Sequence, residues 1–394
     1  MSLGFGAGAR TLRWTAAPGG CTINGVSCPD ESPSDEPTES SGAPKAPALP
    51  KSTPTRPLAT ATATPDAPAA GGTSDPEATP APRAPTETPS LDGTEFAPFV
   101  DVLLYPPYDL AANAAATGVR QYTLGFVVAT GGCTPSWGGV LPVEDPGITD
   151  RVAALRAAGG DVRISFGGAN GTELATVCDS AESLAAAYQR AIDASGATRV
   201  DFDVEGAALG NSNANRRRAE AITILRRNAE GAERPLDVSI TLPALPQGLT
   251  QGGVDLLAGA RDAGVEFDAV NLMAMDYGDA AAPDPDGQMG RFAVDAVTAA
   301  QAQVKGVFER SDDDAWGLLA VTPMIGVNDV ASEVFTVEDA RIVGEFAREK
   351  GLAWYSMWSA TRDAPCPGGP KATADASCSS VSQEALDFTR AFLG

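Results

Sequence analysis

The stretch TRVDFDVEG, residues 198–206, alternates acidic with apolar side chains at the period of a β-strand. Successive side chains of a strand point to opposite faces, so every second residue lies on the same face. One face therefore carries three carboxylates, those of Asp201, Asp203 and Glu205. The other face carries Val200, Phe202 and Val204. The apolar face needs a packed neighbour, and the acidic face needs a special environment, because three like charges in a row repel one another unless a proton is retained.

Three environments could accommodate the acidic face. A solvated surface strand would tolerate the charges, although such strands usually mix them with Thr and Lys. A calcium-binding loop would begin with the same D-x-D-x-E-G spacing, but the bidentate acid expected at its twelfth position falls on Ser212. A closed parallel barrel covers one face of each strand with helices and points the other face into the barrel, toward the mouth at the carboxyl ends of the strands.

The pattern of apolar runs along residues 95–394 favours the barrel. Short runs rich in Val, Ile, Leu and Phe alternate with Ala-rich stretches of helical period, which is typical of repeated β-α units. The predicted strands are 99–105, 121–129, 161–168, 199–206, 236–243, 267–277, 316–325 and 352–358. The predicted helices are 109–117, 149–158, 180–195, 213–231, 252–263, 289–309, 337–350 and 381–392. This alternation predicts an α/β fold of the (β/α)8 TIM-barrel type. An open doubly wound sheet is the alternative, but no G-x-G-x-x-G follows the first strand.

In such a barrel, Glu205 would be the outermost of the three acids on the fourth strand. Asp201 and Asp203 lie progressively deeper, so burial and mutual repulsion are expected to keep a shared proton in the row and to raise the pKa of Glu205. A protonated glutamic acid at the mouth of a barrel can act as a general acid.

The composition excludes several classes of function. The chain has no histidine, which removes Ser-His-Asp and Cys-His catalytic systems and histidine-containing zinc sites. A formal charge of −23 argues against nucleic acid as a partner, because such binding depends on cationic contacts with phosphate. The same charge fits a well-hydrated surface or adaptation to high salt. No apolar run approaches the roughly 20 residues of a membrane helix, so no membrane contact is expected, and neither is a metal or another cofactor.

Residues 29–94 differ in composition from the rest of the chain. They are rich in Pro, Ser, Thr, Ala and Glu and nearly free of large apolar side chains, which predicts a disordered linker between residues 1–28 and a catalytic domain of residues 95–394. The opening residues MSLGFGAGAR lack the apolar core of a signal peptide, so we expect either a fragment or a missing upstream signal.

Six cysteines are scattered along the chain without C-x-x-C spacing, a pattern typical of an exported protein with disulfide bonds. Many pairings are possible, and we favour the local ones. These are Cys21 with Cys28, Cys133 with Cys178, and Cys366 with Cys378.

The acidic row resembles the catalytic motif of glycoside hydrolase family 18, the chitinase family, whose strand-four signature is D-x-x-D-x-D-x-E. Asp201, Asp203 and Glu205 match its last three acids, and Thr198 stands at the first position. The family's S-x-G-G motif on strand three matches the residues from Ser165 to Gly168, and its strand-eight tryptophan matches Trp358. The phrases FGGANGTELA, VNLMAMDYG and TPMIGVNDV look most like the archaeal and bacterial branch of the family.

Strand six departs from the family motif M-x-Y-D, because this chain has Met273, Ala274, Met275 and Asp276, followed by Tyr277. In the family, the tyrosine holds the acetamido carbonyl of the substrate. We assign that role to Tyr277, which would share a strand face with Met275; the alternative is an aromatic packed at the rim. The resemblance also implies Trp358 as a flat floor for the sugar. It implies further residues around the substrate, namely Ser165, Asn271, Met273, Asp276, Met324, Asn328 and Asp329.

The family resemblance implies a retaining mechanism in which the substrate assists. Glu205 would protonate the glycosidic oxygen while the 2-acetamido oxygen of the sugar attacks the anomeric carbon. Asp203 would orient the acetamido group and stabilise the oxazolinium, and Asp201 would share the proton of the row. Chitin and chito-oligosaccharides are the expected partners of a secreted, monomeric enzyme. Two alternatives stay open: an endo-β-N-acetylglucosaminidase acting on N-glycans, and a chitin-binding lectin, which would usually lack the acid at position 205.

Residues 3–28 resemble a different family. The segment LGFGAGARTLRWTAAPGGCTINGVSC is similar to the final strands of a family 2 carbohydrate-binding module. Residues 1–28 are therefore interpreted as the carboxy-terminal fragment of such a module, with an amino-terminal tag as the alternative.

Overall fold

The structure is a computed structural model that describes residues 22–23, 26–27 and 94–394. Two short strands, β1 (Thr22–Ile23) and β2 (Val26–Ser27), pair in antiparallel fashion. The predicted linker over 29–94, apart from its last residue, lies outside the described residues, as do the pairing of Cys21 with Cys28 and the rest of the predicted module fragment. Residues 94–394 form a unit of their own.

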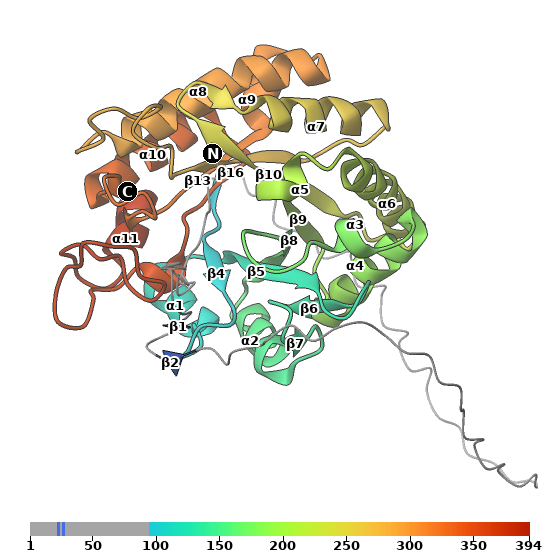
Figure 1. The fold of residues 1–394 in the computed structure, drawn as a ribbon, viewed down its shortest axis with the longest axis horizontal. Coiled ribbons are helices and arrows are strands. Elements are labelled where there is room, and N and C mark those ends of the chain that lie inside the picture. Colours follow the sequence, from blue (N-terminus) through green and yellow to red (C-terminus); the bar gives the residue numbers. More distant parts are fainter. Residues whose placement is uncertain (1–21, 24–25, 28–93) are drawn as a thin grey trace, which may run out of the picture. The chain divides into compact units, whose positions relative to one another are not determined.

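A closed ring of parallel strands forms the centre of residues 94–394 (Figure 1). The first strand consists of two pieces, β3 (Glu95–Phe96) and β4 (Phe99–Asp101). The remaining barrel strands, in chain order, are β5 (Gln121–Ala129), β8 (Asp161–Gly167), β9 (Arg199–Asp203), β10 (Asp237–Leu245), β12 (Ala269–Ala274), β13 (Leu319–Pro323) and β16 (Trp354–Tyr355). Each strand pairs in parallel with the next, and the first closes the ring because β4 pairs with β5 while β3 pairs with β16.

One helix follows each barrel strand, and these helices surround the strands in Figure 1. They are α1 (Leu110–Thr117), α2 (Pro146–Ala157), α4 (Ala181–Ser195), α6 (Ser212–Gly231), α7 (Gln251–Asp262), α8 (Met289–Phe308), α10 (Val337–Lys350) and α11 (Asp387–Leu393). Local sequence fixes several of the starts. Ser180 and Ser183 form a capping box at α4, and Thr336 with Asp339 form another at α10. The predicted TIM barrel is confirmed.

Short additional elements stand in the connections. Four are single turns or short helices: α3 (Leu174–Val177), α5 (Gly206–Leu209), α9 (Asp312–Gly317) and the 3-10 turn η1 (Ala360–Arg362). Five are short strands: β6 (Pro135–Trp137), β7 (Leu141–Pro142), β11 (Gly248–Leu249), β14 (Gly326–Val327) and β15 (Val334–Phe335). Most of them follow the carboxyl end of a barrel strand, which is the face where TIM barrels build their sites.

Several predicted boundaries differ from the structure. The first strand was expected at 99–105, but it runs from Glu95 to Asp101 and ends where the Asp101 side chain accepts a hydrogen bond from the Leu103 amide at 3.0 Å. The predicted strand 316–325 begins only at Leu319, because Ser311 caps α9. The predicted helix 381–392 begins only at Asp387, where the buried Asp363 carboxylate accepts the Phe388 and Thr389 amides at 3.2 and 2.8 Å.

Two disulfides join parts of the barrel unit. Cys133, after β5, bonds to Cys178, after α3, and Cys366 bonds to Cys378 within the segment that follows η1. Both pairs agree with the predicted pairing. Among residues 94–394, no helix is both long enough and apolar enough to cross a membrane.

Candidate active site

Strand β9 is buried on both faces. Val200, Phe202 and Val204 are almost fully buried, and the Phe202 ring lies 5.4 Å from Phe166 and 5.0 Å from Tyr188 of α4, measured between ring centroids. On the opposite face, Asp201 is fully buried and Asp203 is 5% exposed. The acids therefore point into the barrel, and both the solvated surface strand and the calcium loop are excluded.

Asp201 lies at the bottom of the acidic row and is surrounded by hydroxyl groups. Ser165 on β8 and Ser239 on β10 are its register neighbours on the two flanking strands, and each donates a hydrogen bond of 2.7 Å to its carboxylate. Thr241 donates a third bond of 2.9 Å. Burial raises the pKa of Asp201, and these hydroxyl donors oppose the rise because they favour the ionised form.

The Asp201 site extends across the barrel through further hydrogen bonds. Asn271 on β12 donates to Thr241 Oγ1 at 3.0 Å and accepts from Thr322 of β13 at 2.9 Å. Ser165, Asn271 and Thr322 are all buried, so they orient the acids rather than form an open surface. Ser165 and Asn271 were predicted to lie beside the substrate. In the structure Ser165 is level with Asp201 and donates to it, and Asn271 is level with Thr241, which it joins to Thr322.

Asp203 occupies the middle of the row with little to neutralise it. Its Oδ1 atom is buried and has no hydrogen-bond partner among the described residues. Burial, followed by the charges of Glu205 and Asp201, raises the pKa of Asp203 well above its usual range. A buried acceptor without a hydrogen bond costs free energy, so Asp203 Oδ1 is suited to accept a ligand N–H or to share a proton.

Glu205 lies just beyond β9, at the residue before α5, and its side chain is partly accessible. Burial and the charge of Asp276 raise its pKa to about 7. Asp276 follows β12, and burial raises its own pKa to about 6. Glu205 is thus the outermost acid and titrates near neutral pH, as a general acid and base should.

The S-x-G-G motif explains how β8 fits against the row. A Cβ atom on Gly167 would overlap the Asp203 carbonyl oxygen, and the Gly168 amide donates to that oxygen at 3.1 Å. A Cβ on Gly168 would press against the Phe126 ring at 2.8 Å. The two glycines therefore let β8, β9 and Phe126 approach one another closely.

Trp358, after β16, forms an aromatic pair with Phe126 of β5. The two ring centroids are 5.5 Å apart with an interplanar angle of 27°, and Phe99 packs edge-on to Trp358 at 6.2 Å. Both rings of the pair are partly accessible. They give the barrel mouth a flat apolar surface, which is the usual partner for the apolar face of an organic ligand.

The described residues contain no cluster of three or more carboxylates or cysteines arranged to hold a metal ion.

Two curated proteins and a solved structure resemble this chain. A probable bifunctional chitinase/lysozyme of Escherichia coli is 36% identical over 277 residues, which are 68% of this chain and 31% of that protein. Endochitinase 11 of Metarhizium anisopliae is 36% identical over 275 residues, 68% of this chain and 52% of its own length. The catalytic domain of a hyperthermophilic chitinase from Pyrococcus furiosus is 31% identical with a TM-score of 0.68, covering 76% of this chain and 94% of that domain.

The chain belongs to glycoside hydrolase family 18. It spans only 31% and 52% of the two curated relatives, and no family sequence profile matches it. The family-18 motifs on strands three and four lie on neighbouring strands, with Ser165 bonded to Asp201 and Glu205 just beyond β9, and the strand-eight Trp358 follows β16 and packs on Phe126.

Strand six is where the chain departs from the family-18 motif, and the structure alters the prediction for Tyr277. Strand β12 ends at Ala274, and Asp276 has a φ of 51°, so strand alternation stops before Tyr277. The Tyr277 ring packs edge-on to Phe292 of α8 at 6.4 Å, and its buried hydroxyl has no partner among the described residues. The premise of a face shared with Met275 is therefore wrong, and the packing favours a rim aromatic over a contact with the substrate.

The loops after β12 and β13 bring the remaining predicted residues together. Asn328 is fully buried, donates to the Met324 carbonyl at 2.8 Å, and accepts from the Asp276 amide at 3.4 Å. Asp276 in turn accepts from the Val330 amide at 2.9 Å. Met324 is buried beside Trp358 through a backbone bridge, whereas Met273 is half-buried. Asn328 and Met324 thus hold the loop, whereas Met273 and Asp276 stay partly accessible.

Sequence reasoning missed Phe126. It lies inside the apolar run QYTLGFVVA, where an aromatic residue reads as ordinary core. Strand alternation alone would place Phe126 on the same face as the buried Leu124. The register of β5 against β8 shifts between Leu124 and Val127, which breaks the alternation around Phe126, and the sequence carries no signal for that shift.

Proposed function

We propose that this chain hydrolyses the β-1,4 bonds between N-acetylglucosamine units of chitin. The single observation that carries the proposal is the acidic row at the mouth, where burial and Asp276 raise the pKa of Glu205 to about 7 and the buried Oδ1 of Asp203 has no hydrogen-bond partner among the described residues. The Pyrococcus furiosus chitinase, which is 32% identical to this chain in its active domain, has been solved in complex with chito-oligosaccharides.

The first chemical step would use Glu205 as the acid. At neutral pH a carboxyl group with a pKa of about 7 is protonated in a large fraction of molecules. It would donate this proton to the glycosidic oxygen as the bond to the anomeric carbon breaks. The 2-acetamido oxygen of the same sugar would attack that carbon and form an oxazolinium ring, so no protein atom becomes bonded to the sugar.

Asp203 would stabilise this cyclic intermediate. Its unpartnered Oδ1 can accept the acetamido N–H, and its negative charge would offset the positive charge of the oxazolinium. The proton that Asp203 holds in the resting row would pass toward Asp201, whose three hydroxyl donors support a carboxylate but leave room for proton sharing. The electrostatic stabilisation by Asp203 would be strong, because charges interact more strongly in a buried site from which water is excluded.

Glu205 would then act as a base in the second step. After giving up its proton it would activate a water molecule, which attacks the anomeric carbon, opens the oxazolinium and restores the acetamido group. The anomeric configuration is retained because the carbon is inverted twice. The Phe126–Trp358 pair would form the floor under the reacting sugar.

We also propose where the protein works and its oligomeric state. Two disulfides in residues 94–394 support a protein that works in an oxidising environment outside the cytosol. We propose that it is secreted and acts as a monomer on chitin.

The proposal is tested by assaying the full chain and its Glu205→Gln variant on colloidal chitin. The amide keeps the shape of the side chain but cannot transfer a proton, so turnover should fall by about 10² to 10⁴ while binding of chito-oligosaccharides is preserved. Wild-type protein that binds chito-oligosaccharides without cleaving them would indicate a lectin. A variant that keeps more than about a tenth of wild-type turnover would remove Glu205 from its role.

A further inference from the structure

Three large apolar side chains are exposed on two neighbouring loops beside the mouth. Tyr105 is 90% exposed, Val140 is 71% exposed and Leu103 is 40% exposed. Tyr105 and Leu103 belong to the loop that follows β4, and Val140 belongs to the turn between β6 and β7. We refer to Leu103, Tyr105 and Val140 as the loop patch. Such a grouping of exposed apolar side chains usually marks a contact surface.

The two loops of the patch touch each other. Gly138, in the β6–β7 turn, has no room for a Cβ atom because Leu103 Cδ1 occupies the space. The Gly138 amide also donates to the Phe126 carbonyl at 2.8 Å, which ties the turn to the aromatic pair. The turn that carries Val140 is therefore bonded to the backbone of Phe126, and both loops of the patch follow the carboxyl ends of β4 and β5, on the same face of the barrel as the candidate active site.

The loop that carries Tyr105 is braced at both ends. Arg151 of α2 donates to the Val102 carbonyl and to the Tyr108 carbonyl, each at 3.4 Å. Two prolines, Pro106 and Pro107, follow Tyr105 and restrict the backbone between those anchors. The backbone that carries the exposed ring is thus held in place, so less backbone entropy would be lost when a ligand contacts it.

Charge distinguishes this surface from the rest of the molecule. The segments VLLYPPY (102–108) and GGCTPSWGGVLP (131–142) contain no charged residue, although the chain as a whole carries a formal charge of −23. A neutral ligand with apolar faces fits such a surface, whereas a cationic partner would be drawn to the acidic remainder. The pyranose rings of chitin present C–H groups on their faces and uncharged polar groups at their edges.

We propose that the loop patch is an extended binding surface for the chitin chain beyond the sugars at the catalytic row, with Tyr105 as its main contact. This inference rests on the proposed function and deepens it. The surface would contribute on long or insoluble substrates, whose sugars reach past the Phe126–Trp358 pair, and much less on short oligosaccharides, which occupy only the mouth.

The test compares the full chain with Tyr105→Ala, Tyr105→Phe and Ile342→Ala, on colloidal chitin and on chitotetraose. Ile342 is a matched control because it is 39% exposed and lies on the outer helix α10. We expect the ratio of activity on colloidal chitin to activity on chitotetraose to fall about five- to tenfold in Tyr105→Ala. Tyr105→Phe keeps the ring and should retain the ratio, as should the control.

Three results would overturn the inference. Wild-type cleavage of both substrates with an unchanged ratio in Tyr105→Ala would remove the patch as a chitin surface and leave the proposed function standing. A wild-type dimer in sedimentation experiments that Tyr105→Ala converts to a monomer would show that the patch binds a second copy of the chain. If the wild-type chain cleaves neither substrate, the proposed function fails and this inference fails with it.

Discussion

The pKa of Glu205 depends on two features of its surroundings. Burial disfavours the charged form, and the nearby Asp276 carboxylate disfavours it further, so the pKa rises to about 7. Asp276 has a pKa of about 6 and is therefore largely ionised at neutral pH. The negative charge of Asp276 thus helps to keep Glu205 protonated, although Asp276 itself transfers no proton in the proposed reaction.

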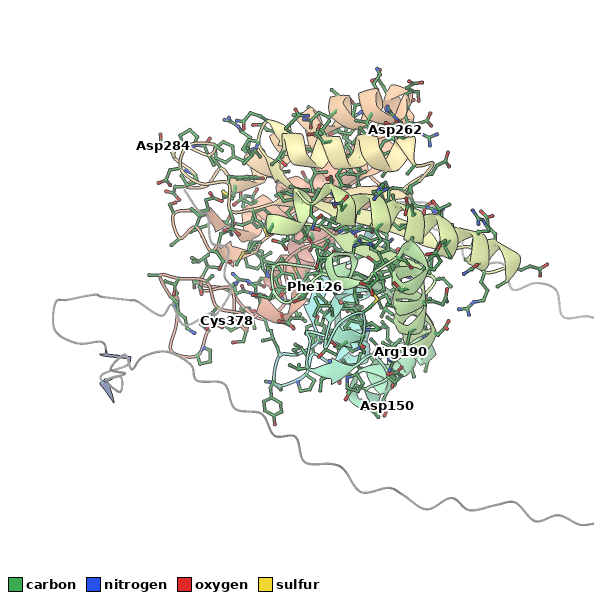
Figure 2. All side chains as sticks on the ribbon, turned by 45° about the vertical axis from the view of Figure 1, so that its right-hand side comes forward. Phe126, Asp150, Arg190, Asp262, Asp284 and Cys378 are labelled. Atoms are coloured by element: carbon green, nitrogen blue, oxygen red, sulfur yellow. A yellow bond between two sulfur atoms is a disulfide. The ribbon has the colours of Figure 1, made fainter. Side chains whose placement is uncertain are left out.

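Replacing Asp276 should shift the pH dependence of hydrolysis. The proposed acid works when protonated, so activity falls as the pH rises through the pKa of Glu205. Asp276→Asn removes a negative charge and lowers that pKa, so the basic limb of kcat/KM should move down by roughly half to one pH unit. Asp150→Asn is the charge-matched control, since Asp150 is an exposed residue of α2 at the lower edge of the barrel unit in Figure 2. A basic limb that stays in place in Asp276→Asn would contradict the assigned electrostatic role.

Tyr277 provides a second test at the residue scale. Strand alternation ends before Tyr277 and its ring packs edge-on to Phe292 of α8, so we predict that its hydroxyl does not contact the substrate. Tyr277→Phe removes only that oxygen and should leave kcat/KM on chito-oligosaccharides within about twofold of wild type, because a phenyl ring fills the same space. A loss of tenfold or more would show that the hydroxyl binds the substrate after all.

At the scale of elements, the turn after β8 limits how the site can be built. Gly167 has a φ of 102°, and a Cβ there would overlap the Asp203 carbonyl oxygen. Gly118, the C-cap of α1, has a similar φ of 82° but nothing within 4 Å of a Cβ. A comparison of Gly167 with Gly118 therefore separates the effect of a positive φ from the effect of crowding around the added Cβ atom.

Gly167→Ala should therefore destabilise the fold far more than Gly118→Ala. We expect about 1 kcal/mol for Gly118→Ala, from the left-handed backbone alone. Gly167→Ala adds overpacking against β9 and should cost about 3 kcal/mol or more. Urea unfolding of both variants measures the difference. Equal losses of stability would mean that β8 can move away from Asp203 without strain.

The elements also show how far sequence reasoning extends. The alternation of acidic and apolar residues predicted correctly which face of β9 carries the acids. Both faces of this strand are buried, and its register is fixed by the pairing of Asp201 with Ser165 and Ser239. Alternation failed for Tyr277, where a positive φ at Asp276 ends the strand geometry. The β6–β7 and β14–β15 ladders were not predicted, because each strand is only two or three residues long and carries no periodic signal.

At the scale of the whole molecule, the barrel brings together residues that are far apart in the sequence. Asp203 comes from β9, Phe126 from β5 and Trp358 from the end of β16, and closure of the ring through β3 and β4 sets them around one mouth. The sequence could supply the strands and the acidic motif. It could not supply the Phe126–Trp358 pair or the loop patch, because these depend on contacts between connections whose conformations only the folded chain determines.

The most direct test of the central claim is the digestion of partly deacetylated chitosan, followed by mass spectrometry of the new reducing ends. If the acetamido group is the nucleophile, only an N-acetylated sugar can react, so every new reducing end should be N-acetylglucosamine. New reducing ends that carry glucosamine would contradict the account, because a sugar without the acetamido group could then be cleaved by a different nucleophile.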